Sequence, residues 1–219
     1  MEKLLQNKVC IITGAAQGIG KAIVERFAED GAIVYAFDRQ LGAMDEWTKL
    51  ISEKFETKIV PMYCDITDGL IVKDALRSIY KQEGHIDVLV NNACRGNNGI
   101  LSDLDYDGFD YVLAVGLKAP YELSRLCKEE LKKNRGHIIN IASSRAFQSE
   151  PDTEAYASAK GGIVALTHAL AISLGPDVLV NCIAPGWINV MDEVTYSKTD
   201  EMAIPAGKVG NPKDISSMV

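Results

Sequence analysis

The stretch KVCIITGAAQGIG, residues 8–20, decides how this chain folds. It begins with β-branched and other apolar residues, typical of a buried strand, and passes directly into a turn with three glycines. Gly14, Gly18 and Gly20 stand where a tight turn lacks room for side chains, so that the backbone and a helix N-terminus can approach a pyrophosphate. The stretch therefore predicts a strand, a nucleotide-binding turn and a helix, in that order.

The same alternation of short apolar runs and longer amphipathic stretches continues along the chain. Nearly continuous apolar strands linked by helices indicate a parallel sheet covered on both faces. The sequence therefore predicts an α/β fold, a doubly wound Rossmann-type sheet with right-handed crossovers, in a single domain over residues 1–219. Strands are expected at 8–13, 32–37, 58–63, 86–90, 137–142 and 178–184, and helices at 18–30, 43–55, 68–82, 106–134, 154–174 and 212–219.

Composition narrows the classes of function. The 219 residues include 23 Lys and Arg against 30 Asp and Glu, which gives a net charge of −7. No basic run interrupts this acidity, so we expect no nucleic acid and no membrane surface as a partner. The apolar stretches are too short for a bilayer span or a signal peptide, and we expect a cytoplasmic protein. Because the cysteines show no CxxC spacing and the histidines no HExxH or HxH spacing, no metal site is expected.

An acidic residue follows the glycine turn at the distance that dinucleotide-binding folds use. The second apolar run ends in FDR, which puts Asp38 about twenty residues after the turn. Its carboxylate would accept hydrogen bonds from the adenosine ribose hydroxyls and would repel a 2′-phosphate, so NAD(H) is favoured over NADP(H). Arg39 is the counterargument, and it keeps NADP(H) as the alternative.

A tyrosine and a lysine lie four residues apart in the stretch EAYASAKGGI, residues 154–163. On a helix Tyr156 and Lys160 share one face, an arrangement that also occurs on solvated helices. The following helical stretch is apolar almost all round, so the phenol and the ammonium need partners or a chemical task. An ammonium about 4 Å from a phenol is worth roughly 4 kcal/mol at an effective dielectric near 20, or about three pKa units. We therefore expect Lys160 to lower the pKa of Tyr156 toward that of a general acid and base working near neutrality.

Six motifs together resemble the short-chain dehydrogenase/reductase family. They stand in the family's order and spacing over essentially the whole chain: TGAAQGIG (13–20), CDIT (64–67), NNA (91–93), NIASS (140–144), YASAK (156–160) and APGWI (184–188). The resemblance implies an oxidoreductase that transfers a hydride between a nicotinamide cofactor and a small alcohol or ketone. It also implies Tyr156 as the general acid and base, Lys160 as its partner, Ser143 as the carbonyl-orienting hydroxyl, and a homo-oligomeric assembly, a dimer or tetramer.

The resemblance further implies which residues surround the cofactor. Asp65 and Ile66 would flank the adenine, Asn91 would support the central strand beside the cofactor, and the PGWI segment would lie under the nicotinamide. The full set expected at the cofactor is Gly14, Gln17, Gly18, Ile19, Gly20, Asp38, Arg39, Asp65, Ile66, Asn91, Ala93, Tyr156, Lys160, Pro185, Gly186 and Ile188.

The sequence departs from the family pattern at several places. Gly116 stands where the family usually has an asparagine that completes a proton relay. A glycine in mid-helix costs roughly 1 kcal/mol of helix stability, so we expect it to mark an irregularity of the long helix. The missing side chain would also leave room for a water. Cys94 replaces the glycine after NNA, as a space-filling side chain or, less favoured, as a nucleophile. Val190 replaces a threonine. The family's last strand does not appear before Val219, so we expect a sheet without its final edge strand or a fragment of a longer chain.

Alternatives of other classes stay open. A cofactor-binding protein with little or no turnover is compatible with Gly116. A 3-oxoacyl-thioester reductase or a sugar dehydrogenase would carry the same motifs. A sugar-nucleotide epimerase or dehydratase shares the Tyr/Lys pair, but the TGxxxGxG spacing and the absence of a substrate domain after residue 190 argue against it.

Overall fold

A computed structural model describes residues 3–96, 98–191 and 194–219 of the chain. Six parallel strands form one sheet in the order β3-β2-β1-β4-β5-β6, which confirms the predicted doubly wound α/β fold. Each strand lies within two residues of its expected range. The strands are β1 (Val9–Thr13), β2 (Ile33–Asp38), β3 (Ile59–Tyr63), β4 (Val88–Asn91), β5 (His137–Ile141) and β6 (Leu179–Ile183).

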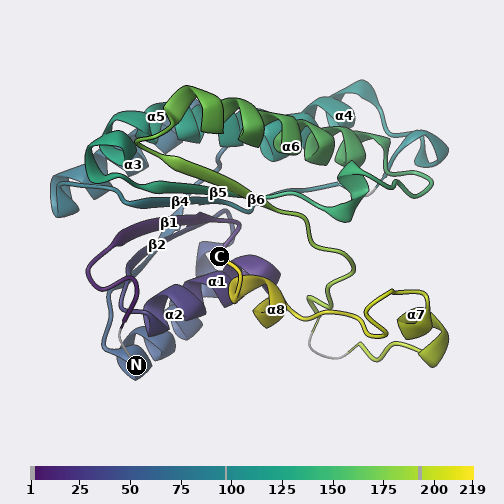
Figure 1. Cartoon of the computed structure of the whole chain (residues 1–219), viewed down its shortest axis with the longest axis horizontal. Helices are drawn as coiled ribbons and strands as arrows, with labels where there is room; N and C mark the ends of the chain where they lie inside the picture. The colour runs from purple at the N-terminus through teal and green to yellow at the C-terminus, as the bar shows by residue number, and fades with distance from the viewer. Residues whose placement is uncertain (1–2, 97, 192–193) are drawn as a thin grey trace.

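Helices cover both faces of the sheet, as the apolar strands require. Their bounds are α1 (Gly18–Glu29), α2 (Leu41–Phe55), α3 (Gly69–Glu83), α4 (Tyr106–Leu113), α5 (Ala119–Asn134), α6 (Glu154–Leu174), α7 (Lys198–Met202) and α8 (Pro212–Ser216). One face is covered by α3, α5 and α6, and the other by α1, α2 and α8 (Figure 1). The short helix α7 sits on an excursion that projects from the body of the molecule between β6 and α8 (Figure 1).

Alternating residues of each strand supply two separate apolar cores. In β1, Val9 and Ile11 face the layer of α3, α5 and α6, whereas Cys10 and Ile12 face the layer of α1, α2 and α8. All four side chains are fully buried, which is the period-two pattern of a strand enclosed on both faces. This double burial explains why the strands read as unbroken apolar runs.

The helix expected over 106–134 is interrupted. Between α4 and α5 the chain forms a π-helical turn over Ala114–Lys118, and Gly116 is buried at its centre. The predicted irregularity at this glycine is therefore confirmed. Wide turns of this type are rare and are found mostly as single turns within α-helices, often at functional sites.

Short elements differ most from the sequence-based expectation. Helix α7 was not expected, and it is held by a capping box in which Ser197 and Asp200 bond to each other's backbone amides. Two 3₁₀ turns, Ile100–Ser102 and Ser144–Ala146, were not expected either, while the last expected helix ends at Ser216. A helix of three to five residues makes little more than one turn, so it is too short to show the helical period of apolar residues.

The expectation that no segment has the length and polarity of a bilayer span is not met by α6. By length and composition alone, its 21 residues could cross a membrane. Helix α6 packs against β6 and β5, however, and it carries Tyr156 and Lys160. A helix that covers a sheet passes the same composition test, so α6 is weak evidence for a membrane.

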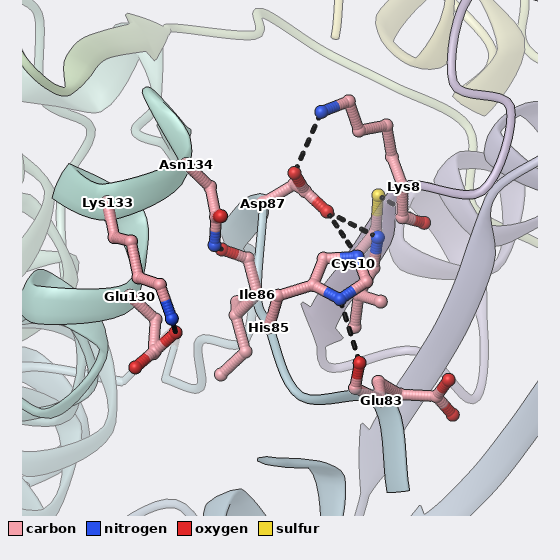
Figure 2. Close-up of polar contacts among 10 residues, drawn as sticks. Lys8, Cys10, Glu83, His85, Ile86, Asp87, Glu130, Lys133 and Asn134 are labelled. Atoms are coloured by element: carbon pink, nitrogen blue, oxygen red, sulfur yellow. Dashed lines mark hydrogen bonds and ion pairs between the residues drawn. The ribbon is translucent and has the colours of Figure 1, made fainter.

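A polar cluster joins β1 and β4 at the amino ends of these strands. Asp87 accepts hydrogen bonds from the Val9 amide and the Lys8 ammonium, both at 2.9 Å, and the Nε2 atom of His85 lies 3.2 Å from the same carboxylate (Figure 2). The His85 Nδ1 atom lies 2.8 Å from the Glu83 carbonyl oxygen. The buried carboxylate thus ties the start of β1 to the segment before β4, at the end of the sheet opposite to the strand ends described next.

Candidate active site

A cleft of about 1020 Å³ opens at the carboxyl ends of the strands. From β1 the chain proceeds outward through β2 and β3, and then returns to the other side of β1 as β4, so strand order reverses between β1 and β4. Ligands of open α/β sheets bind at such a switch point. The predicted residues that line the cleft are Gly14, Gln17, Gly18, Ile19, Asp38, Arg39, Asp65, Ile66, Ala93, Ser143, Tyr156, Lys160, Pro185, Gly186 and Ile188.

Two residues of the predicted set, Gly20 and Asn91, do not line the cleft. A Cβ atom on Gly20 would lie 2.0 Å from the Gly14 carbonyl oxygen, so this glycine serves the contact between helix and turn. The Asn91 side chain is buried and donates to the Asn140 side chain of β5 at 2.8 Å. Its role is therefore between strands, as the resemblance implied, and direct cofactor contact is not supported for either residue.

The glycine turn is built for close approach of backbones. Gly14 has φ +66°, and a Cβ there would lie 2.8 Å from the Ala93 Cα atom. The Thr13 hydroxyl accepts hydrogen bonds from the amides of Asn92 and Ala93, both at 3.1 Å, and the Asn92 side chain donates to the Thr13 and Gly14 carbonyls. These hydrogen bonds hold the ends of β1 and β4 together. The glycines of the turn over 14–20 leave its backbone open to a ligand beside these strand ends. Such a backbone cradle fits the phosphates of a dinucleotide.

Asp38 and Arg39 stand on the β2 side of the cleft. One Asp38 oxygen accepts from the Ala16 amide and the other from the Gln40 amide, both at 3.0 Å, so the carboxylate is fixed against the glycine turn. The Arg39 Nε atom lies 3.5 Å from an Asp65 oxygen, and its guanidinium donates to the Tyr111 hydroxyl. Arg39 is thus engaged by groups from two other segments of the cleft wall.

The Asp65 carboxyl shows how this wall stabilises charge. Burial alone would raise its pKa, but hydrogen bonds from the Thr67 hydroxyl and amide, together with the Arg39 guanidinium, lower the pKa below its usual value. The Thr67 hydroxyl donates at 2.7 Å and the amide at 3.0 Å. Asp65 is therefore an anion fixed at the cleft.

Tyr156 lies in the first turn of α6 and faces the cleft beside Ser143. Burial raises the pKa of the phenol; a nearby Cys94 thiolate would raise it further, while the Ser143 hydroxyl and the Arg145 cation act in the opposite direction. The expected lowering of this pKa by Lys160 is therefore wrong. The physical reason is desolvation, which favours the neutral phenol more strongly than its neighbours favour the anion.

Lys160 is 3% exposed, and its Nζ atom donates to the Ile141 carbonyl oxygen at 2.6 Å. The ammonium lies 5.6 Å from the centroid of the Tyr156 ring, which confirms that the two side chains share one helix face. Burial lowers the pKa of Lys160, and the thiols of Cys94 and Cys182 oppose that shift. The site therefore holds a desolvated cation next to a desolvated phenol.

The cleft wall includes residues that the sequence analysis did not assign to a site. Most of them lie at the carboxyl end of a strand or within five residues after it, where the carboxyl-end rule could have found them. Tyr111 from α4 gave no signal in the sequence. The additional lining residues are Phe37, Gln40, Tyr63, Cys64, Asn92, Cys94, Arg95, Gly96, Tyr111, Val115, Ile141, Ala142 and Val190. In the described part of the chain, no group of three or more His, Cys, Asp and Glu side chains is arranged to hold a metal ion.

Known proteins share both the sequence and the fold. The family described as short chain dehydrogenase matches residues 8–201. An uncharacterized oxidoreductase of Thermotoga maritima is 40% identical over 227 residues, covering 98% of this chain and 88% of that protein. The 3-oxoacyl-[acyl-carrier-protein] reductase FabG of the same organism is 34% identical over 221 residues, covering 98% and 89%. A solved apo SCOR enzyme from Clostridium thermocellum is 58% identical with a TM-score of 0.84, covering 98% of this chain and 84% of that one.

The chain therefore belongs to the short-chain dehydrogenase/reductase family, a family of oxidoreductases that use NAD(P)(H). The six motifs that carried the resemblance all lie inside the matched range. The roles of individual site residues stay predictions.

Proposed function

We propose that the protein transfers a hydride between NAD(H) and an alcohol or ketone, with Tyr156 as general acid and base. The observation that carries the proposal is the meeting of Ser143, Tyr156 and Lys160 with Asp38 and the glycine turn in one cleft. These residues come from four separate segments of the chain. A cleft that combines a phosphate cradle with a protonated phenol and a buried cation suits carbonyl reduction.

The residues present fit a dinucleotide. The turn over 14–20 would hold the phosphates, Asp38 the adenosine ribose, and the segment over 185–188 the nicotinamide side. When bound, the nicotinamide supplies or takes up the hydride.

Proton transfer belongs to the chain's own residues. Because burial raises the pKa of Tyr156, the phenol keeps its proton at neutral pH and can donate it to the oxygen of a carbonyl substrate. The Ser143 hydroxyl, at the cleft wall beside it, can orient that oxygen. The Lys160 ammonium offers positive charge where the phenol oxygen becomes an anion.

Asp38 supports NAD(H) as the cofactor. Its carboxylate is fixed by two backbone amides at the cleft wall, so it cannot easily move away from a 2′-phosphate. Arg39, the residue that would attract such a phosphate, is already paired with Asp65 and Tyr111.

A 3-oxoacyl thioester is the alternative substrate class, favoured by the FabG relative. The separating experiment titrates NADH and NADPH by fluorescence and then screens alcohols, sugars, sterols and oxoacyl thioesters for turnover. We expect tighter binding of NADH and turnover that disappears in Tyr156→Phe, while Tyr63→Phe, a change elsewhere in the same cleft, keeps it. NADH binding without turnover of any substrate would instead favour a cofactor-binding protein.

A further inference from the structure

The Asp152 carboxylate gathers backbone amides from the segment between β4 and α4. Its Oδ1 atom accepts hydrogen bonds from the amides of Gly99, Leu101 and Ser102, at 3.0, 2.7 and 2.9 Å. The Ser102 hydroxyl donates to the Oδ2 atom of the same carboxylate. Backbone N–H groups that converge in this way form a concavity that binds anions. In this protein a carboxylate from the segment between β5 and α6 occupies it.

Glu154, the first residue of α6, bonds to the same loop. Its Oε2 atom accepts from the Ile100 amide at 3.0 Å, so four consecutive amides are held by two carboxylates. A Cβ atom on Gly99 would meet that Glu154 oxygen and lie 2.8 Å from the carbonyl carbon of Asp152, so the contact requires glycine there. We call this arrangement of Asp152, Glu154 and residues 99–102 the clamp.

The backbone and the charge of Asp152 both suit the clamp. Its φ of +64° is a left-handed conformation that few residue types other than glycine, asparagine and aspartate adopt. Hydrogen bonds, that of the Ser102 hydroxyl first, lower the pKa of the Asp152 carboxyl below its usual value. The carboxyl is therefore an anion at neutral pH.

The clamp stands directly before the helical turn that carries Tyr156. Thr153, the N-cap residue of α6, makes no capping hydrogen bond with its side chain, and the Ala157 amide donates to the Thr153 carbonyl oxygen at 2.7 Å. Helix ends fray unless other groups hold them. The residues on either side of Thr153 are Asp152 and Glu154, so the first turn of α6 is held through the clamp.

Apolar packing supports the same connection. Ala155 in the first turn of α6 is fully buried and belongs to one cluster with Val112 of α4. Leu104 packs against this cluster, and its amide donates to the Gly99 carbonyl oxygen at 3.0 Å. The loop that the two carboxylates hold therefore continues into the helix that packs on α6.

We propose that Asp152 is a positioning residue for Tyr156: through the clamp it anchors the first turn of α6, and with it the phenol, to the segment between β4 and α4. Asp152 acts through Tyr156, so its effect on turnover rests on the proposed function. A phenol that must meet a substrate oxygen at hydrogen-bond distance loses rate when its helical turn moves, since a misplacement of about 1 Å can cost about a hundredfold.

The first test uses amide hydrogen exchange of the full chain, followed by NMR without a cofactor. Asp152→Gly removes the carboxylate, and glycine adopts the left-handed conformation without strain. Exchange of the Ala157 amide should become about tenfold faster, while that of the Thr167 amide in the middle of α6 keeps its rate. A variant in which Leu101 and Ser102 exchange faster and Ala157 does not would overturn the proposal, because the carboxylate would then hold the loop alone.

The second test measures turnover of the substrate that the screen identifies. Asp152→Gly should lower kcat by about tenfold and leave the affinity for NADH within about twofold. Asp152→Asn keeps an oxygen acceptor in the same backbone conformation and should retain most of the wild-type kcat. A kcat of Asp152→Asn as low as that of Asp152→Gly would contradict the role of the hydrogen bonds. If the wild type turns over no substrate, the proposed function fails, and the exchange of Ala157 alone decides on the clamp.

Asp103→Gly is the matched control. Asp103 directly follows Ser102, is exposed and has a φ of +52°, so the change removes the same charge and places glycine at another left-handed position. It should leave both the exchange of Ala157 and kcat at their wild-type values, and equal effects of Asp103→Gly and Asp152→Gly would overturn the proposal. If Asp152→Gly does not fold, Gly99→Ala, which brings a Cβ atom against the clamp, replaces it in both tests with the same expected results.

Discussion

Lys160 combines nearly full burial with a positive charge, so this residue lowers the free energy of unfolding of the protein. Burial lowers its pKa, which means that the unfolded chain holds the proton more tightly than the folded chain does. This loss of stability is complete at pH values below the folded pKa, and it disappears as the pH rises toward the ordinary lysine value of about 10.4. Groups of this kind are kept where function requires them.

Lys160→Met should therefore raise the melting temperature at pH 7 by a few degrees while it removes activity. Methionine fills a similar volume without charge, although the Ile141 carbonyl oxygen loses its partner. The gain should shrink as the pH is raised from 7 to 10, because the lysine then loses its proton in the folded state. Calorimetry across this pH range checks it, with Lys49→Met on an exposed position of α2 as the control. A melting temperature below that of the wild type at pH 7 would contradict the account.

Asp38 is the residue on which cofactor choice depends. Asp38→Ala removes the carboxylate that would bond the ribose and repel a 2′-phosphate, so it should weaken NADH binding and narrow the preference for NADH over NADPH by roughly tenfold, or about 1.4 kcal/mol. Fluorescence titration of both cofactors measures the ratio. Arg39→Ala is the companion variant and should widen the preference instead. A wild-type protein that binds NADPH more tightly would reverse the assignment.

At the scale of elements, the packing of the π-helical turn over Ala114–Lys118 depends on the small size of Gly116 and of Cys94, which lies against it. Gly116→Asn alone would bring its Cβ atom against Ala159 and Cys94, a steric conflict that typically costs about 1–3 kcal/mol. We therefore expect a lower melting temperature for Gly116→Asn and a partial recovery in Gly116→Asn with Cys94→Gly. Thermal unfolding of the two single variants and the double variant measures the coupling free energy between positions 116 and 94.

Gly161→Ala provides the matched control for that cycle. Gly161 also lies within a helix, but a Cβ atom there has no neighbour within 4 Å. This variant should be neutral or stabilising by up to about 1 kcal/mol, because alanine is the better helix former. If Gly116→Asn proved as stable as Gly161→Ala, the packing of Cys94 on the turn would have no energetic weight.

The elements that the sequence predicted well are those with enough residues to show a period. The helix over 154–174 was predicted with the bounds of α6, whereas the 106–134 prediction missed the π-helical turn as a separate element. Glycine in mid-helix indicated an irregularity, but its type depends on contacts with Cys94 and Ala159 from other segments. Local sequence does not contain those contacts.

At the scale of the whole molecule, the order of strands explains why so much of the cleft could be predicted. Once a glycine turn follows the first strand, the doubly wound topology brings the ends of the strands together at one edge. Tyr111 escaped prediction because it reaches the cleft from the middle of a helix, where it accepts a hydrogen bond from Arg39. The direction of the pKa shift of Tyr156 could not be predicted, because the burial that causes it is a property of the packed molecule.

The outer face of α6 bears on the assembly of the whole molecule. Of the most apolar 18 residues of this helix, 28% are buried within the chain. Ala165, His168, Ala169 and Ile172 are exposed at helical spacing and form one stripe, and Ile172 is 73% exposed. An apolar helix face left in water favours association. We propose that a second copy of the chain covers this stripe, in keeping with the homo-oligomer expected from the sequence.

Ile172→Glu tests this assembly. A carboxylate buried between two copies would be desolvated without a partner, so the variant should shift the protein toward a 23.8 kDa monomer while the wild type sediments as a dimer or tetramer. Sedimentation velocity over a range of concentrations measures the masses. Leu50→Glu, at a position on α2 that is 58% exposed, adds the same charge on the opposite layer and should leave the assembly intact. A monomeric wild type would rule the proposal out, and dissociation by both variants would show that added charge, not the α6 stripe, governs association.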